Sequence, residues 1–399
     1  MAARSKFAAQ GSRILLVDDE PLNLDLLQQE LDGLGFEIST ARDGREALKQ
    51  IADSPPDLIF LDLMMPGIDG FSVLERLQIH EQWRSIPVVI ISASDDQANI
   101  VRGIELGAVD FLPKPFEPAI LQARLSSALE KKRLRDLEQQ QLQALERELE
   151  IGRQIQAGFL PQNIPQPAGW RIEAHFRAAR EVAGDFYDLF PLRAGRTGVL
   201  LGDVTDKGVG AALYMALIRT LLRASVMQDG LAISADGEQQ RTDQTTLVNA
   251  VGLVNRYLCQ LHGSAMLASV FFAILNEDSG SLTYVSAGQD PPMLLRGGKV
   301  DGELAATGPV VGALETAVYQ AATCLLAPGD GLLLYSDGIT DSLAPDGGRF
   351  GLEGLRRAAV MPDGPTLELR PILAALQQHM DGANQYDDIT LLLLQRTPN

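Results

Sequence analysis

The stretch ARLSSALEKKRLRDLEQQQLQALERELEIGRQIQAGFLP, residues 123–161, separates two different sequence patterns. Neither Gly nor Pro occurs between Arg124 and Gly152, and Leu, Gln, Glu, Lys and Arg dominate. These residue types lose little side-chain freedom in a helix. The composition therefore predicts one long helix from about Gln122 to about Pro161, acting as the mechanical link between two domains.

Leucines in this helix are spaced as in a coiled coil. Leu142, Leu145 and Leu149 form one group, and Leu134 and Leu137 form another that is out of phase with it. So narrow an apolar seam has no obvious partner within its own chain. We therefore expect the helices of two copies to pair, giving a homodimer.

Length and charge limit the classes of function. A chain of 399 residues is too long for one ordinary core, which indicates two domains. A net charge of -18 argues against a nucleic-acid surface.

We see no signal peptide and no apolar run of membrane-spanning length. Two isolated cysteines, Cys259 and Cys324, are typical of reduced core residues, so we expect a cytoplasmic protein without membrane or nucleic-acid partners.

The first pattern alternates short apolar runs with amphipathic segments. The helices begin near Pro21 and at Arg45, and the strands are expected at Ile14–Val17, Glu37–Thr40, Leu58–Leu61, Pro87–Ser92 and Val109–Leu112. Continuous apolar strands that alternate with helices predict a five-stranded parallel, doubly wound α/β sheet. Ligands of such sheets bind beyond the carboxyl ends of the strands.

Acidic residues stand at those ends. Asp18, Asp19 and Glu20 follow the first strand, and Asp62 ends the third. Carboxylates that converge on one edge repel each other, and a hard cation such as Mg²⁺ relieves the repulsion. Ser92 and Lys114, at the ends of the fourth and fifth strands, would hold a phosphoryl group. A carboxylate beside a metal and a lysine is suited to accept a phosphoryl group.

The motifs LVDDEP, LDLMMPGIDGF, ISAS and FLPKPF resemble those of CheY-like response-regulator receivers over the whole first domain. The resemblance implies that Asp62 accepts phosphate from a sensor histidine kinase or a small phosphodonor. It further implies that Asp18, Asp19, Asp62 and the Met64 carbonyl hold Mg²⁺, that Ser92 and Lys114 bind the phosphoryl group, and that Phe111 is the switch aromatic. The Lys114–Pro115 bond is expected to be cis.

The second pattern runs from strands through helices back to strands. Strands are expected at Trp170–Ala179, Val199–Leu201, Met266–Leu275, Ser281–Gly288, Leu294–Leu295, Ala321–Leu326, Gly331–Tyr335 and Ile389–Leu394, and helices from Ala211, at Leu247–Leu261 and at Pro371–Met380. The polar segment Met227–Thr246 is expected to be a loop. This order predicts an α+β domain with two antiparallel sheets packed between helices.

Acidic residues again border apolar strands in this domain. They are Asp185, Asp203, Asp337, Asp387 and Asp388. A lone carboxylate is costly at such positions, and four at one edge would need cations. Oxygen-only ligands favour Mg²⁺ or Mn²⁺ over zinc. Two such ions would supply an activated water and a clamp for a phosphate, which is the chemistry of phosphoester hydrolysis.

The segments IQAGFLP, EVAGDFYD, GDVTDKGVGAAL, LAPGDGLLLYSDGITDS and YDDITLLLL resemble the SpoIIE-like branch of the metal-dependent PPM protein phosphatases. The resemblance implies two Mn²⁺ or Mg²⁺ ions held by Asp185, Asp203, Asp337 and Asp387, with Asp203 bridging and the Val204 carbonyl as a further ligand. Between Asp387 and Asp388, we favour Asp387. The chain departs from the family pattern at Gln289, where His is common, and at Ala183 and Asp206, where Gly is common.

These features predict a receiver at 13–129, a coiled-coil-like linker at 130–160 and a phosphatase domain at 161–399. The predicted function is a two-component response regulator in which phosphorylation of Asp62 controls a protein serine/threonine phosphatase. Its expected substrate is a phosphorylated regulatory protein, such as a STAS-type anti-sigma-factor antagonist. The alternative is a non-catalytic PPM-fold protein that sequesters a partner under receiver control.

Overall fold

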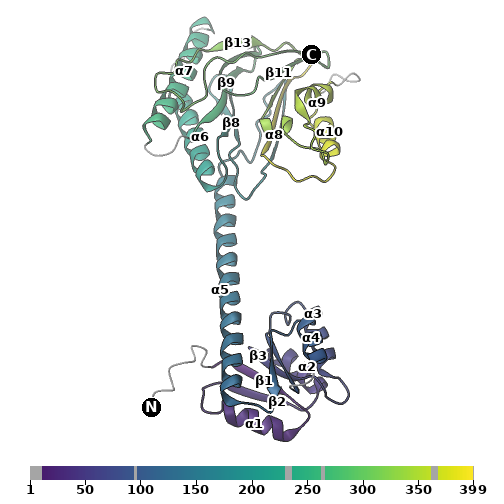
Figure 1. Cartoon of the computed structure of the whole chain (residues 1–399). Coiled ribbons are helices and arrows are strands. Elements are labelled where there is room, and N and C mark those ends of the chain that lie inside the picture. Colours follow the sequence, from purple (N-terminus) through teal and green to yellow (C-terminus); the bar gives the residue numbers. More distant parts are fainter. Residues whose placement is uncertain (1–10, 94–96, 230–235, 262–265, 361–366, 399) are drawn as a thin grey trace. The chain divides into compact units, whose positions relative to one another are not determined.

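The computed structural model describes residues 11–93, 97–229, 236–261, 266–360 and 367–398. The chain divides into two compact units, Met1–Leu145 and Glu146–Asn399, and each has its own hydrophobic core (Figure 1). The two units contain different kinds of sheet, as the sequence predicted.

The first unit is built on a five-stranded parallel sheet of order β2-β1-β3-β4-β5. The strands are β1 (Arg13–Val17), β2 (Glu37–Ala41), β3 (Leu58–Asp62), β4 (Val88–Ala93) and β5 (Asp110–Lys114). The helices are α1 (Pro21–Leu31), α2 (Gly44–Asp53), α3 (Gly70–Ile79), α4 (Gln97–Glu105) and the first part of α5 (Pro118–Ala157). Both faces of the sheet are covered by apolar clusters, which confirms the predicted doubly wound α/β fold.

Local capping fixes where two of these helices begin. The Asp43 carboxylate accepts hydrogen bonds from the backbone amides of Arg45 and Glu46, both at 2.8 Å, at the start of α2. Asp69 accepts one from the Ser72 amide at the start of α3, also at 2.8 Å. Such caps satisfy amides that have no partner in the first helical turn. The start of α3 lies close to the end of β3, since a Cβ atom on Gly70 would lie 2.3 Å from the Asp62 carbonyl oxygen.

The second unit contains two five-stranded antiparallel sheets, of order β13-β10-β9-β8-β7 and β12-β11-β14-β15-β6. The first comprises β7 (Phe186–Leu192), β8 (Arg196–Val204), β9 (Ala268–Asn276), β10 (Ser281–Ala287) and β13 (Ala322–Leu325). The second comprises β6 (Trp170–Arg177), β11 (Met293–Arg296), β12 (Lys299–Glu303), β14 (Gly331–Tyr335) and β15 (Ile389–Arg396). One apolar cluster includes residues of both sheets, so the sheets pack face to face.

Helices cover the outer faces of this sandwich (Figure 1). The helices α6 (Val209–Asp229) and α7 (Asp236–Gln260) pack on the first sheet, and α9 (Gly351–Ala358) and α10 (Arg370–Met380) pack on the second. The short helix α8 (Asp337–Thr340) follows β14. The arrangement confirms the predicted α+β domain with two antiparallel sheets between helices.

Helix α6 is long and apolar enough to span a membrane by length and composition alone, contrary to our expectation that no run has that length. Its buried residues recur every three or four positions and pack on the first sheet: Ala211, Met215, Ile218, Leu222 and Val226. That stripe is the pattern of an amphipathic helix on a core. Burying each large member contributes roughly 1.5–3 kcal/mol.

Some predicted elements were wrong or missed. The expected loop Met227–Thr246 is helical up to Asp229 and again from Asp236, whereas residues 230–235 lie outside the described part of the chain. Apolar residues further along α7, such as Leu247 and Val251, pack on the core. This packing stabilises α7 as a whole, so that the helix includes the polar segment from Asp236. The sequence analysis also missed β7, β12, α8 and α9. The cysteines Cys259 and Cys324 are free and only partly buried.

Helix α5 has 40 residues and changes character along its length. Leu121, Leu125 and Leu129 are buried in the core of the first unit. Further along, four leucines of the predicted seam are exposed by 44–58%: Leu134, Leu137, Leu142 and Leu145. The same helix therefore serves as a core element and then presents apolar side chains to solvent.

A buried ion pair joins β7 to α6. The fully buried Asp188 carboxylate contacts the guanidinium groups of Arg219 at 2.8 Å and Arg223 at 3.0 Å. We expect Asp188→Ala to lower the free energy of unfolding by roughly 3–5 kcal/mol, because it leaves partly buried cations without a partner. Denaturant unfolding followed by Trp170 fluorescence in a Trp83→Phe background would report on this unit.

The control is Asp301→Ala, which removes an exposed pair with Arg296 at 2.8 Å. Exposed pairs contribute about 0–1 kcal/mol. Equal unfolding free energies for the Asp188 and Asp301 variants would contradict the structural role of Asp188.

Candidate functional site

The first candidate site lies at the carboxyl ends of β1, β3 and β5. Carboxylate oxygens of Asp18, Asp19 and Asp62 lie within 4.8 Å of one another. The Lys114 Nζ atom donates to Asp62 Oδ2 at 2.7 Å and to Asp18 Oδ2 at 2.9 Å. The parallel sheet thus brings together four residues from three strand ends, as predicted.

Burial and charge set the protonation of this cluster. Burial raises the pKa of Asp62, and the neighbouring Asp18 carboxylate adds to the increase, while Lys114 opposes it. Burial alone would lower the pKa of Lys114, but its bonds to Asp62 and Asp18 outweigh that effect and raise it. One lysine faces three carboxylates, so the donor set retains excess negative charge. An all-oxygen set of this kind fits Mg²⁺.

The remaining predicted receiver residues lie at or near the ends of β3, β4 and β5. The Met64 amide donates to Asp62 Oδ1 at 3.3 Å. Ser92 is buried at the end of β4, and its neighbour Ala93 is paired with Lys114 on β5. Phe111 is partly buried, with the Arg124 guanidinium 5.6 Å from its ring centroid. The Lys114–Pro115 peptide bond is cis, as predicted.

The second candidate site draws on both sheets of the sandwich. Asp203 lies in β8 and Asp185 directly precedes β7, and both of these strands belong to the first sheet. Asp337 follows β14 and Asp387 precedes β15, and these strands belong to the second sheet. Asp185 is buried, and Thr390 Oγ1 donates a hydrogen bond to its Oδ2 atom. Close backbone packing supports the arrangement, since a Cβ atom on Gly338 would lie 1.9 Å from the Asp388 carbonyl oxygen.

The carboxylates of this site raise one another's pKa values. Burial, followed by the charges of Asp337 and Asp387, raises the pKa of Asp203 to about 7. Burial and the charge of Asp387 raise the pKa of Asp337 to about 6. Burial and the charge of Asp203 raise the pKa of Asp185 well above its ordinary value. These groups would ionise readily only with cations between them, so the donor set fits Mn²⁺ or Mg²⁺.

Asp387 and Asp388 have different surroundings. The buried Asp388 carboxylate accepts hydrogen bonds from the amides of Ala179 and Gly184, both at 2.8 Å, and of Asp185 at 3.3 Å. Its oxygens are therefore used to hold the backbone before β7. The Asp387 carboxylate is partly exposed and contacts the Lys207 Nζ atom at 2.9 Å. The Asp387 Oδ1 atom also accepts a hydrogen bond from the Asp388 amide at 2.9 Å, but of the two carboxylates it is the less buried and so the more accessible to a cation.

The departures from the family pattern have structural explanations. Gln289 is buried, donates to the Tyr335 carbonyl at 3.1 Å and accepts from the Ser269 hydroxyl at 2.9 Å. Ser269 is paired with Asp203 across β8 and β9, so Gln289 ties the two sheets together beside the site. Asp206 adopts φ 83°, the left-handed conformation that favours glycine, and Asp tolerates it better than most residues. Ala183 is buried.

The sequence analysis missed Lys207. Besides Asp387, its Nζ atom contacts the Tyr386 carbonyl at 2.9 Å and lies 4.2 Å from the Tyr386 ring centroid. Lys207 is the one basic residue of the GDVTDKGVGAAL motif. A single positive charge within an acidic motif could have identified Lys207 as a partner of the site carboxylates.

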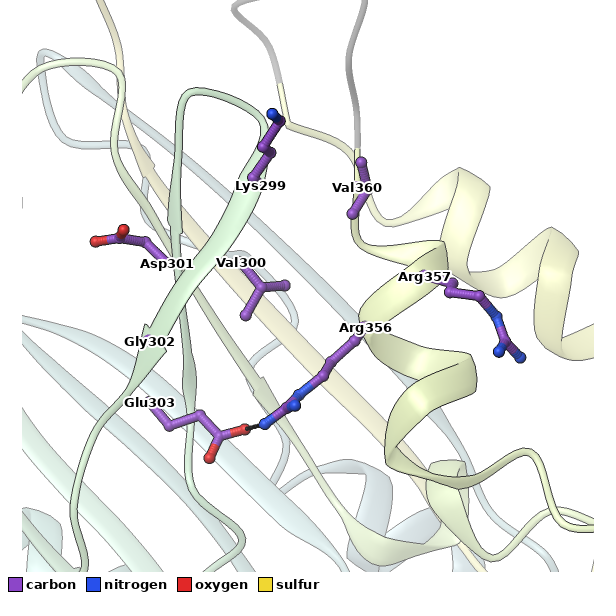
Figure 2. Close-up of a pocket in the computed structure, with 8 residues that line it drawn as sticks. All are labelled: Lys299, Val300, Asp301, Gly302, Glu303, Arg356, Arg357 and Val360. Carbon is purple, nitrogen blue, oxygen red and sulfur yellow. Dashed lines mark hydrogen bonds and ion pairs between the residues drawn. The ribbon is translucent and has the colours of Figure 1, made fainter.

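A surface pocket of about 650 Å³ lies between β12 and α9 (Figure 2). The Arg356 guanidinium crosses it to an ion pair with Glu303 at 2.7 Å, and Lys299 and Arg357 border it (Figure 2). None of the acidic site residues lines this pocket. The site is therefore defined by its carboxylates and not by this cavity.

Fold and site residues together define a response-regulator receiver joined to a PPM-type phosphatase domain. A family model described as Stage II sporulation protein E (SpoIIE) matches residues 193–397, and one described as Response regulator receiver domain matches residues 14–126. The SpoIIE match covers half of the chain. The chain belongs to the SpoIIE family and carries a receiver domain ahead of the phosphatase domain.

Individual relatives cover the chain in parts. Protein IcfG of Synechocystis sp. is 37% identical over 262 residues, which is 62% of this chain and 41% of that protein. Response regulator PleD of Caulobacter vibrioides is 46% identical over 117 residues, which is 29% of this chain and 26% of that protein. The chain thus spans less than half of either relative.

Among solved structures, the SiaA-PP2C domain of Pseudomonas aeruginosa matches with a TM-score of 0.54 and 19% identity. The match covers 64% of this chain and 98% of that chain. At this level of identity, the likeness shows the fold.

The pKa values of the second site predict a pH dependence of metal binding. Asp203 and Asp337 bind protons near pH 7 and 6, so a cation must displace protons at lower pH. We expect the Mn²⁺ affinity to fall between pH 8 and 5.5, approaching roughly tenfold per pH unit for each proton displaced. Their raised pKa values also make the metal-free protein less stable as the pH rises through 6–7.

Calorimetric Mn²⁺ titrations at several pH values, in two buffers of different ionisation enthalpy, would measure both affinity and proton release. An Asp19→Asn background weakens the receiver site, so that the heat reports on the second site. A constant affinity without proton release would contradict the assigned cluster.

Proposed function

We propose that this chain is a response regulator in which phosphorylation of Asp62 controls a metal-dependent protein serine/threonine phosphatase. The observation that carries the proposal is the set of four carboxylates gathered from both sheets, Asp185, Asp203, Asp337 and Asp387. Burial and neighbouring carboxylates raise the pKa values of Asp185, Asp203 and Asp337. Membership of the SpoIIE family and the receiver match support it. We propose functional boundaries at 13–129, 130–160 and 161–399.

In the phosphatase domain, Asp185, Asp203, Asp337 and Asp387 would hold two Mn²⁺ or Mg²⁺ ions, with the Val204 carbonyl as a further ligand. When bound, these ions supply an activated water and neutralise phosphate charge. Asp388 holds the backbone that presents Asp185. Thr390 orients the Asp185 carboxylate, and Lys207 restrains Asp387.

In the receiver, Asp62 would accept the phosphoryl group from a sensor histidine kinase or a small phosphodonor. Its carboxylate, with those of Asp18 and Asp19 and the Met64 carbonyl, would hold Mg²⁺. Lys114 already contacts Asp62 and would bind the negatively charged phosphoryl group there. Ser92 would donate a hydrogen bond to the phosphoryl oxygens. Phe111 would reorient on activation.

The proposed substrate is a phosphorylated regulatory protein of the STAS type, and the proposed location is the cytoplasm. We further propose a homodimer that forms through α5. The exposure of Leu134, Leu137, Leu142 and Leu145 supports it, because pairing with a second copy would bury them. A dimer of this helix gives the receiver a means to influence the phosphatase domain.

We expect Asp337→Ala to reduce Mn²⁺-dependent hydrolysis at least about hundredfold, because it removes a proposed metal ligand. Initial rates on an aryl phosphate and on a phosphorylated STAS-type protein would measure the loss. The control is Asp346→Ala, a turn residue whose carboxylate accepts a bond from the Gly348 amide. Full activity of the Asp337 variant would refute the site, and an inactive wild type would favour the sequestering alternative.

Regulation by the receiver is tested separately. We expect acyl phosphate or beryllofluoride to change the hydrolysis rate of the wild type but not of Asp62→Asn, because the variant has no phosphoacceptor. Equal wild-type rates with and without the phosphate analogue would remove the gating proposal and leave the phosphatase assignment intact.

A further inference from the structure

The last turn of α5 contains a polar side chain that is buried although its neighbours are exposed. Gln156 is 7% exposed, whereas Ile155, beside it, is 60% exposed. An amide is buried without cost only when its donor and acceptor are both satisfied. Its environment therefore indicates a specific set of bonds rather than apolar packing.

Both ends of the Gln156 amide bond to one residue. Nε2 donates to the Ala183 carbonyl at 2.7 Å, and Oε1 accepts from the Ala183 amide at 2.9 Å. The side chain thus pairs with the backbone as a neighbouring strand would. One turn earlier, a Cβ atom on Gly152 would lie 3.6 Å from Val182, so the helix runs close to this segment.

The segment held by Gln156 leads directly to Asp185. Gly184 and Asp185 are held from the other side, because their amides donate to Asp388 at 2.8 and 3.3 Å. The Gly184 carbonyl also accepts from the Val204 amide at 3.3 Å. The backbone that carries Asp185 is therefore fixed between α5 and the start of β15.

We propose that Gln156 is a positioning residue that holds Asp185 in place for metal binding, and that displacement of α5 is transmitted to the metal centre through its two bonds to Ala183. This inference rests on the proposed function, since it takes Asp185 as a metal ligand. Rotation or translation of the last turn of α5 would pull on the Ala183 backbone or release it. Either change alters where the Asp185 carboxylate lies relative to Asp203.

The test compares Gln156→Met, which keeps the side-chain volume but forms neither bond, with Gln156→Glu, which keeps an acceptor for the Ala183 amide. The matched control is Gln154→Ala, because Gln154 lies on the same turn and its exposed side-chain amide donates to Glu150 at 2.9 Å and not to the Ala183 segment. All are made in the full chain. Calorimetric Mn²⁺ titration in the Asp19→Asn background gives the affinity of the phosphatase site, and hydrogen exchange gives the protection of the Ala183 amide.

We expect Gln156→Met to bind Mn²⁺ about tenfold more weakly, because part of the free energy of the two lost hydrogen bonds is lost from the metal site. Its kcat at saturating Mn²⁺ should stay within about twofold of the wild type, since no group at the reacting atoms has changed. The Ala183 amide should exchange faster, Gln156→Glu should recover part of the protection, and the response to beryllofluoride should shrink. Gln154→Ala should behave as the wild type.

Unchanged Mn²⁺ affinity in Gln156→Met, with faster exchange at Ala183, would overturn the proposal. So would a loss of kcat at saturating Mn²⁺ without a change in affinity. If Gln156→Met does not fold, the Mn²⁺ affinity of Gln156→Glu and the protection of its Ala183 amide test the proposal instead. A wild type that binds Mn²⁺ but hydrolyses no phosphoester would refute the proposed function, while the binding data would still decide the role of Gln156.

Discussion

Burial of ionised carboxylates is the constraint on which both sites of this protein depend. Removing an unpaired carboxylate from water is costly, and a second one nearby increases the cost. In the first unit, Lys114 balances part of the charge of Asp18 and Asp62. In the second, Asp203 and Asp337 have pKa values raised to about 7 and 6, because neighbouring positive charge does not offset their burial and mutual repulsion. Each fold holds these groups together because its core outweighs the repulsion.

The two folds bring their carboxylates together in different ways. A parallel sheet places the carboxyl ends of its strands on one edge, so Asp18 and Asp62 meet through the pairing of β1 with β3. In the sandwich, Asp203 belongs to one sheet and Asp337 to the other. Their meeting depends on face-to-face packing of the two sheets and on Gln289, which bonds to Ser269 and Tyr335 across them.

The sequence predicted most of the fold because apolar runs and turn residues are local signals. The strand ends that carry Asp62, Asp203 and Asp337 could be located in this way. Other features depend on contacts between distant segments. The role of Asp388 follows from bonds to amides near residue 184, and the helical start of α7 is polar and owes its conformation to packing further along. Neither appears in a local pattern, which explains why the start of α7 was mistaken for a loop.

The differing surroundings of α5 along its length bear on how a single helix could connect the two sites. An exposed apolar seam such as Leu142 and Leu145 is favourable only when another surface covers it, so in the proposed dimer its pairing would respond to conditions elsewhere in the molecule. The last turn of α5, by contrast, is fixed by two short bonds from Gln156 to Ala183. In the proposed mechanism, core packing at one end of α5, the exposed seam in its middle and the bonds of Gln156 at the other end would let displacement pass along the helix. A helix can transmit such displacement because the hydrogen bonds between its successive turns keep it stiff.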